Sequence, residues 1–436
     1  MATQHAAEGY SVVFEKNGHA RLSEKKHLVI ASRLDVFARP LCGLLLSVLG
    51  VCAVSGPVAA ADLPVVAPDL PFDYKIRFTG YADTAVAGDA TSDNPQFSGR
   101  VDAYFKNISL WEDGHFDFHL EAVGGDNING LGSGVILPTN LWAAYPRSSG
   151  DTNVDLNVSF TQKINPSLAF TIGKINAPDM ARAAPLVGGN GEGGFLYNGI
   201  SAPPPGSVLP AYTFGAMLAG SIDNWIYNFW VYDPNNAQGS SFWKNLFDDG
   251  VVMNGTLEYR TDFGGLPGFY GVNFIYSTAE GTDLDSLLLP PGSDGFARQT
   301  SGLTYTTLKF TQYLSFDPER PSEGWGIFGF LGIGDGNPGI LDNSFMLGIG
   351  GTSPIDGRNK DRWGVAWARY NWSDDLIAAL DELVDAELRD EWVVEAYYEA
   401  EIIEGIRLGM NLERVRPGAA DADDYTQIGM RISASF

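Results

Sequence analysis

The sequence has 436 residues, of which 44% are hydrophobic and 12% aromatic, and its formal net charge is −25. This acidic balance excludes nucleic acid as a partner, because a polyanion binds to a basic surface. The length allows two ordinary domains, although a β-barrel of this size often forms one.

Residues 1–61 have the pattern of a signal peptide that is removed. Basic residues precede an apolar run from Leu41 to Val54, and the small residues 59–61 follow it. The run is too short to span a membrane as a helix. Cleavage removes six basic and four acidic residues and both cysteines, which leaves 22 basic and 49 acidic residues and a net charge of −27. We therefore expect an exported chain without disulfides, with 62–436 as a single domain; a lipoprotein cut at Cys52 is the alternative.

From Phe72 onward, apolar and polar residues alternate with a period of two, which is typical of strands with one apolar and one polar face. A soluble sandwich also alternates, but its strands are mostly shorter. The alternation predicts sixteen strands, at 72–81, 99–111, 115–124, 152–162, 167–175, 211–220, 224–231, 251–262, 268–278, 303–316, 324–333, 343–351, 361–370, 391–402, 406–415 and 424–436.

The connections between these strands alternate in length. Short turns are expected at 112–114, 163–166, 263–267, 317–323 and 403–405. Longer connections are expected at 82–98, 125–151, 176–210, 232–250, 279–302 and 371–390. This arrangement predicts an all-β fold, a transmembrane antiparallel β-barrel of about 16 strands with long extracellular loops and short periplasmic turns. The sheet must close, because unpaired backbone groups are costly in hydrocarbon. The registers of strands 11 to 13 stay open, since aromatic residues occupy both of their faces.

The chain ends on Phe436, at the apolar face of the last strand. This ending looks like the assembly signal of outer-membrane barrels. We therefore expect the barrel assembly machinery as a partner through Phe436, outer-membrane lipids around the wall, and localisation in the bacterial outer membrane.

Strand parity places charged side chains of both signs on the water side. Such groups suit polyhydroxyl solutes, since each hydroxyl both donates and accepts a hydrogen bond. The alternative is that they are ordinary lumen residues paired with each other. The candidate pore-lining residues on strands are Arg77, Arg100, Asp102, Lys106, Glu121, Lys174, Glu258, Arg260, Glu395, Glu399, Arg407 and Arg431.

The connection 176–210 is the candidate constriction loop, because long loops without regular structure are commonly functional. We expect it to fold into the lumen and to present aromatic rings to sugars; an exposed surface loop is the alternative. Its candidate residues are Asp179, Arg182, Glu192, Phe195 and Tyr197. A second outer loop has leucines at helical spacing, which predicts a short helix at 374–390 that packs onto the barrel mouth.

Several segments resemble the carbohydrate-selective porin family known as OprB. They are GKINAPD (173–179), GWGIFGFLGIGDGNP (324–338) and the end from VVEAYYEAEIIEGIRLGMNLERVRPG (393–418) to IGMRISASF. The GDWGGLR-type opening that many members carry before the first strand is not found in this sequence. The resemblance implies a sixteen-stranded barrel that passes sugars passively, with loops folded inward as a constriction.

We expect a passive channel for small carbohydrates, with no cofactor, no metal and no enzyme activity. The two histidines of the mature chain, His115 and His119, are four positions apart on a strand, about 13 Å, which is too far to share a metal. Both are beside a predicted periplasmic turn, where they are poorly placed for serine hydrolysis. The alternatives are a general or cation-preferring porin, a plugged barrel that acts as an adhesin or anchor, and a barrel hydrolase.

Overall fold

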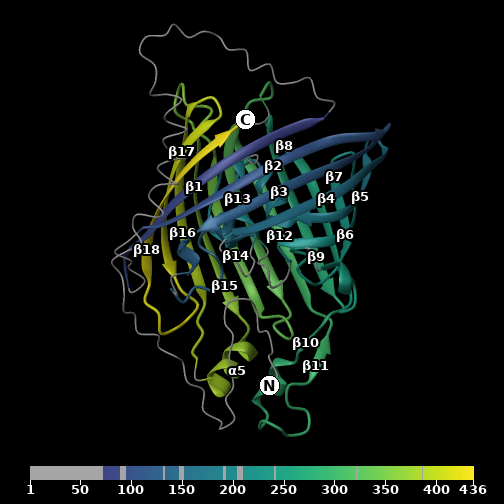
Figure 1. Ribbon diagram of the computed structural model, residues 1–436, viewed down its shortest axis with the longest axis vertical. Coiled ribbons are helices and arrows are strands. Elements are labelled where there is room, and N and C mark those ends of the chain that lie inside the picture. The colour runs from purple at the N-terminus through teal and green to yellow at the C-terminus, as the bar shows by residue number, and fades with distance from the viewer. Residues whose placement is uncertain are drawn as a thin grey trace. The chain divides into compact units, whose positions relative to one another are not determined.

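The computed structural model describes residues 72–88, 95–130, 133–146, 152–189, 193–203, 210–239, 242–320, 323–384 and 386–436. Within these residues, sixteen antiparallel strands close into one barrel in the order β1-β18-β17-β16-β15-β14-β13-β12-β9-β8-β7-β6-β5-β4-β3-β2 (Figure 1). The predicted signal peptide lies outside the described residues. None of the described helices is long and apolar enough to cross a membrane.

The barrel strands are β1 (Asp73–Ala87), β2 (Gln96–Trp111), β3 (Gly114–Gly125), β4 (Thr152–Asn165), β5 (Leu168–Asn176), β6 (Tyr212–Ile222), β7 (Trp225–Tyr232), β8 (Val252–Phe263), β9 (Leu266–Ser277), β12 (Thr304–Phe316), β13 (Gly324–Gly334), β14 (Leu341–Thr352), β15 (Arg362–Trp372), β16 (Glu391–Ile403), β17 (Ile406–Arg416) and β18 (Tyr425–Ser435). The loops hold η1 (Ile128–Gly130), α2 (Leu141–Ala144), α3 (Ala177–Arg182), α4 (Asn198–Ser201), η3 (Phe242–Asn245), β10 (Glu280–Thr282), η4 (Leu284–Leu288), β11 (Gln299–Ser301) and α5 (Asp374–Val384).

The side chains on the outer face of the strands are apolar. The side chains between them point to the inner face and include polar ones. On β17, Met410 is 56% exposed and Leu412 is 51% exposed, whereas Asn411 between them is 3% exposed. Successive side chains point to opposite faces of a strand, so the exposed apolar residues form the lipid-facing surface. The buried residues face the enclosed lumen.

All sixteen predicted barrel strands are confirmed, and their ends differ by a few residues in most cases. The largest difference is at β1 and β2, which extend to Ala87 and from Gln96 and shorten the loop predicted at 82–98. Small residues end β1, so its apolar periodicity is weak there, but backbone pairing to β2 and β18 continues. The open registers are also settled, because β13 buries Phe328 and Phe330 and exposes Leu331.

A short periplasmic turn joins β16 and β17. Only two residues, Glu404 and Gly405, separate the strands, and Gly405 has a φ of +79°. A Cβ at this position would lie 2.7 Å from the carbonyl oxygen of Ser435. Glycine is therefore required both by the backbone conformation and by the neighbouring strand.

The helix predicted at 374–390 is real but shorter, so its predicted end is wrong. α5 ends at Val384. Farther along, Leu388 forms a β-bridge with Ala419, and the Arg389 N–H donates to Gly418 O at 2.8 Å. Pairing with the loop between β17 and β18 thus overrides the helical spacing of the leucines. α5 and the β10–β11 pair, which was not predicted, lie at the end of the barrel opposite the C-terminus (Figure 1).

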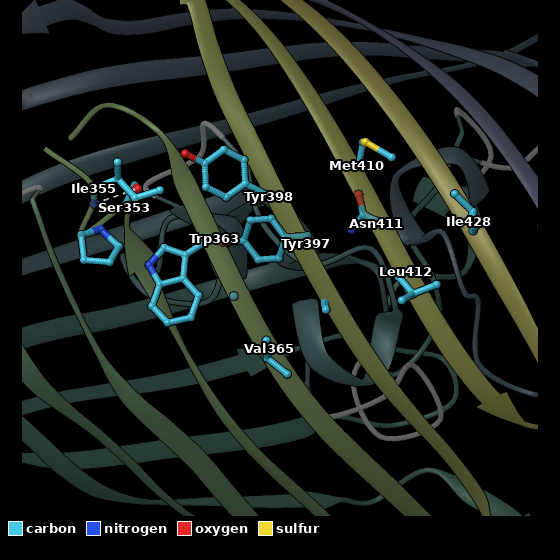
Figure 2. Close-up of a pocket in the computed structure, with 13 residues that line it drawn as sticks. Ser353, Ile355, Trp363, Val365, Tyr397, Tyr398, Met410, Asn411, Leu412 and Ile428 are labelled. Carbon is cyan, nitrogen blue, oxygen red and sulfur yellow. Dashed lines mark hydrogen bonds between the residues drawn. The ribbon is translucent and has the colours of Figure 1, made fainter. Parts of the chain in front are cut away.

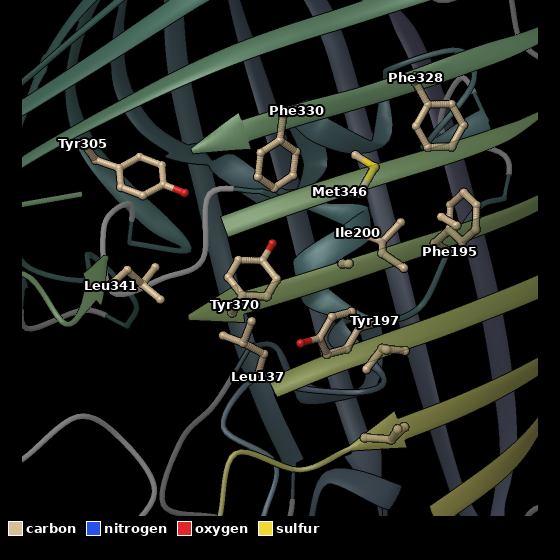
Figure 3. Packing of buried hydrophobic residues seen from close by; sticks show 14 of the residues in the cluster. Leu137, Phe195, Tyr197, Ile200, Tyr305, Phe328, Phe330, Leu341, Met346 and Tyr370 are labelled. Carbon is tan, nitrogen blue, oxygen red and sulfur yellow. The ribbon is translucent and has the colours of Figure 1, made fainter. Parts of the chain in front are cut away.

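The main apolar core lies inside the barrel, on one side of the lumen. The inner faces of β13 to β16 contribute Phe328, Phe330, Met346 and Tyr370, among others. Loop residues between β5 and β6 pack against this surface, and Figure 3 shows Phe195, Tyr197 and Ile200 beside it. A segment that connects two strands at the barrel end therefore enters the barrel interior.

Candidate functional site

Two loops meet inside the barrel, one between β3 and β4 and the other between β5 and β6. Leu141 N–H donates to Leu196 O at 2.8 Å, and Asn198 N–H donates to Pro138 O at 2.8 Å. Asn140 caps the short helix α2 by accepting a hydrogen bond from the Ala143 N–H. We call the described residues 133–146 and 193–203 the inward loops.

Arg100 on β2 lies between two carboxylates. Its Nη2 is 2.7 Å from Asp102 and 2.5 Å from Glu121. The strands dictate this arrangement, because Arg100 and Asp102 are two positions apart on one face, and Glu121 is the cross-strand partner of Asp102. The guanidinium also donates to the carbonyl oxygens of Trp142 (3.3 Å) and Tyr145 (2.6 Å). Arg100 thus ties the inner wall to one inward loop.

α3 brings two candidate loop residues against the same part of the wall. Arg182 lies over the Trp142 ring, 4.3 Å from its centroid, and its Nη1 is 3.7 Å from Asp102. Asp179 accepts a hydrogen bond from the Tyr104 hydroxyl at 2.7 Å. Asn176 accepts from the Asp179 N–H and so caps α3, which fixes both side chains at this position.

Lys174 on β5 extends this set of charges. Its Nζ is 2.6 Å from Asp155 Oδ1 and lies over the rings of Tyr212 and Phe242. We call the buried or half-buried charged residues on β2 to β5 and α3 the polar cluster. Its members are Arg100, Asp102, Glu121, Asp155, Lys174, Asp179 and Arg182.

Four acidic side chains line the inner faces of β16 and β17. Glu391, Glu395 and Glu399 share one face of β16, and Glu413 lies directly opposite Glu395 in the strand register. All four are at most 1% exposed. We call them the carboxylate wall. Arg431 on β18 compensates part of its charge, since its Nη2 is 2.5 Å from Glu399.

The remaining candidates on strands lie outside both groups. Arg77 donates to Ser435 Oγ at 3.3 Å, and Arg407 pairs with Glu401 at 2.8 Å. Glu258 pairs with Lys309 at 3.1 Å, which fits the alternative of ordinary paired lumen residues. Lys106 and Arg260 are exposed.

The structure contradicts the expected role of two loop aromatics. Phe195 and Tyr197 are 0% exposed, so neither ring is available to stack on a solute. Phe195 packs edge-on against Phe328 and Tyr397, and the Tyr197 hydroxyl donates to Glu391 at 2.9 Å. Burial and the neighbouring Glu391 carboxylate raise the pKa of Tyr197, which keeps its hydroxyl a donor. Glu192 lies outside the described residues.

One group of side chains in the described residues has the spacing of metal ligands. It consists of Asp102, His119 and Glu121, whose possible ligand atoms lie within 4.8 Å of one another. The Arg100 guanidinium contacts both carboxylates of this group, and His119 Nε2 is 3.0 Å from Asp102. A cation in the same place would be repelled by that guanidinium. The donor set therefore fits an ion-pair network and not a metal site.

The sequence did not single out Trp142, Glu391 or Asn140 as site residues. Glu391 could have been found, because it continues the period of two that already includes Glu395 and Glu399. The sequence around Trp142 and Asn140 gives no such signal, since their positions depend on contacts with distant strands. Asn140, for example, donates to Asp83 on β1 at 2.9 Å.

An apolar groove of about 610 Å³ lies on the other face of the wall, across β15 to β18. Figure 2 shows the lining side chains Trp363, Val365, Tyr398, Met410, Leu412 and Ile428. Val365, Met410 and Leu412 are all exposed residues of the outer face. The groove therefore belongs to the lipid-facing surface and not to the lumen.

The fold agrees with that of one solved structure, and further solved structures match more weakly. Pseudomonas putida OprB at high pH matches with a TM-score of 0.69 and 18% identity, over 84% of this chain and 94% of that chain. Its low-pH structure matches with a TM-score of 0.47, 15% identity and coverage of 84% and 93%. Pseudomonas aeruginosa OccK8 (OprE) has a TM-score of 0.45 and 10% identity, with coverage of 84% and 98%.

A search of curated protein sequences found no match. The family model described as carbohydrate-selective porin, OprB family, matches residues 87–436, which is most of the chain. The barrel, its two-faced strands and this match agree on an outer-membrane channel for passive sugar diffusion. The chain belongs to the OprB family of carbohydrate-selective porins.

Proposed function

We propose that small carbohydrates cross this barrel past the inward loops, which form its constriction and are held in place by the polar cluster and the carboxylate wall. The observation that carries the proposal is that the three cations of the polar cluster are all paired with carboxylates. Arg100, Lys174 and Arg182 are offset by Asp102, Glu121 and Asp155, with separations of 2.5 to 3.7 Å.

Paired charges favour neutral polyhydroxyl solutes over ions. The six paired side chains are at most 6% exposed, so they act on a solute through their combined field and not by direct contact. A neutral sugar needs no counter-charge, whereas an ion gains little net attraction from charges of both signs. The alternative of a general, cation-preferring porin rests on the net charge of −27 expected for the mature chain. The carboxylate wall consists of four acidic side chains, whose charge Arg431 compensates only in part, and it therefore favours that second function.

Liposome swelling distinguishes the two functions. We expect glucose to enter faster than gluconate, a charged solute of similar size. Arg182→Ala unbalances the polar cluster and should change the ratio of the two rates. The matched control is Arg320→Ala, because Arg320 is paired with Asp317 and Glu323 in the turn between β12 and β13 and is 54% exposed. Equal rates for glucose and gluconate in the wild type would contradict sugar selectivity.

We propose outer-membrane lipids and the barrel assembly machinery as further partners. Phe436 supports both, since it is 71% exposed next to the outward-facing ring of Phe78. Its backbone is also paired with Ile76, through hydrogen bonds of 2.9 and 3.1 Å. The last residue is thus presented to lipid while the backbone beside it closes the barrel.

We also propose that the chain is a channel without enzyme activity. The support is that the polar contacts of the two described histidines are with carboxylates, His115 at 3.9 Å from Asp117 and His119 at 3.0 Å from Asp102, and not with a serine hydroxyl that they could activate. Turnover of ester or glycoside substrates above that of buffer, by folded protein in detergent, would contradict this. Conductance steps in planar bilayers would contradict a plugged adhesin.

A further inference from the structure

We infer that Glu391 and Glu395 are positioning residues that hold the inward loops against the barrel wall and thereby set the width of the channel. The inference rests on the proposed path, because it assumes that these loops form the constriction. The role inferred for the two glutamates is to hold the backbone of the loops, and it requires no contact between a solute and that backbone.

Glu391 binds both inward loops at once. Its Oε2 accepts hydrogen bonds from the N–H groups of Ile136 (2.6 Å) and Gly418 (3.1 Å). Its Oε1 accepts from the N–H of Leu137 (3.0 Å) and the hydroxyl of Tyr197 (2.9 Å). One carboxylate therefore joins residues from the β3–β4, β5–β6 and β17–β18 connections.

Glu395 lies four positions farther along the same face of β16. It binds two backbone amides of the second loop. Its Oε1 accepts from the Leu196 N–H at 2.7 Å and from Asn411 Nδ2 at 2.6 Å. Its Oε2 accepts from the Tyr197 N–H at 3.0 Å. Both oxygens are used, so only a carboxylate can satisfy all three donors.

These contacts decide the position of the loops because the amides involved need an acceptor. Leu137, Leu196 and Tyr197 are at most 6% exposed, so their N–H groups are shielded from bulk water. An N–H that loses its acceptor in such a place is costly, and the segment moves to find another partner. The apolar contacts of Phe195 and Ile200 with β13 to β15 orient the loop but offer no acceptor.

Glu413 provides a matched control within the same wall. It lies directly opposite Glu395, is the same residue type and is equally buried. Within the described residues its hydrogen bond comes from Gln427 Nε2 at 3.3 Å and not from a loop amide. Replacing Glu413 removes a carboxylate from the lumen without removing an anchor.

The experiment compares Glu391→Gln/Glu395→Gln, Glu413→Gln and the wild type in planar bilayers. We expect the double variant to increase single-channel conductance by about two-fold or more, since a wider pore passes more ions. Amide exchange at Leu196 and Tyr197 should accelerate by about ten-fold or more. Glu413→Gln should leave exchange unchanged.

Folding of each variant is checked by its heat-dependent mobility in gels. Should the double variant fail to fold, Glu395→Asp keeps the charge and withdraws the carboxylate by one methylene from the loop amides; the same increase in exchange is then expected. Wild-type conductance and wild-type protection of Leu196 in a folded variant would overturn the inference. Ion conductance and amide exchange are measured without sugar, so these readouts can fail while sugar selectivity holds, or succeed while it fails.

Discussion

Replacement of Arg100 by methionine is the sharpest test of the polar cluster. The change keeps an unbranched, flexible side chain, although a shorter one, and removes the charge between Asp102 and Glu121. Both carboxylates are 0% exposed as side chains. They would be left buried without their main counter-charge, which typically destabilises a protein by about 3–5 kcal/mol.

The remaining contacts place the expected loss near the lower end of that range. Glu121 keeps the amide donors of Asn157 (2.8 Å) and Asn176 (2.9 Å), and Asp102 keeps Arg182 at 3.7 Å. On the other side, Arg100 also loses its hydrogen bonds to two loop carbonyl groups. We therefore expect a decrease of about 3 kcal/mol in the free energy of unfolding.

Urea unfolding of the barrel in lipid vesicles, followed by tryptophan fluorescence, measures this change. Arg100→Lys should fall between the wild type and Arg100→Met, because an ammonium keeps the charge but not the planar set of donors. Adding Asp102→Asn and Glu121→Gln to Arg100→Met should recover much of the loss, since the uncompensated charges are then gone. If the free energy of unfolding of Arg100→Met falls by less than about 1 kcal/mol, and the triple variant shows no recovery, the assumption that this network is shielded from water is refuted.

The other predictions concern the extracellular loop between β9 and β12 and the C-terminus. Hydrogen bonds from Asn337 and Arg298 hold the pKa of Asp283 below its usual value. These hydrogen bonds to the ionised Asp283 therefore stabilise the loop fully above pH about 4. The stabilisation is lost as the pH falls through the lowered pKa of Asp283. Amide exchange across 280–301, corrected for intrinsic rates, should accelerate below that pH, and Asp283→Asn should cause the same acceleration at pH 7. Phe436→Ala should reduce the amount of assembled barrel in the outer membrane, measured by heat-dependent mobility, without changing the conductance of channels that do assemble.

The barrel itself could be predicted because its signal is local and repeated. Each strand must place apolar side chains toward lipid, so the period of two is visible in residues such as Leu408, Met410 and Leu412 without knowledge of any neighbour. The positions of the short turns follow from the same pattern, because each turn lies where the alternation stops. Where both faces are apolar, as in β13, the period disappears, and the register depends on what fills the lumen beside it.

The contacts of the inward loops could be predicted only in outline, because they join residues far apart in the chain. Ile136 and Glu391 are 255 positions apart, and no pattern near either residue indicates the other. For the same reason, Phe195 and Tyr197 were expected to face a solute. A loop sequence shows that rings are present, but the inner surfaces of β13 to β16 decide which way they point.

The anchors of the inward loops bind main-chain amides, so these hydrogen bonds do not depend on which side chains the held residues carry. Exchanging Ile136, Leu137 or Leu196 for another amino acid preserves the N–H that the carboxylate holds, with proline as the exception. Along the proposed path, the solute preference can therefore be redesigned at the side chains of the inward loops, while Glu391 and Glu395 on β16 stay unchanged.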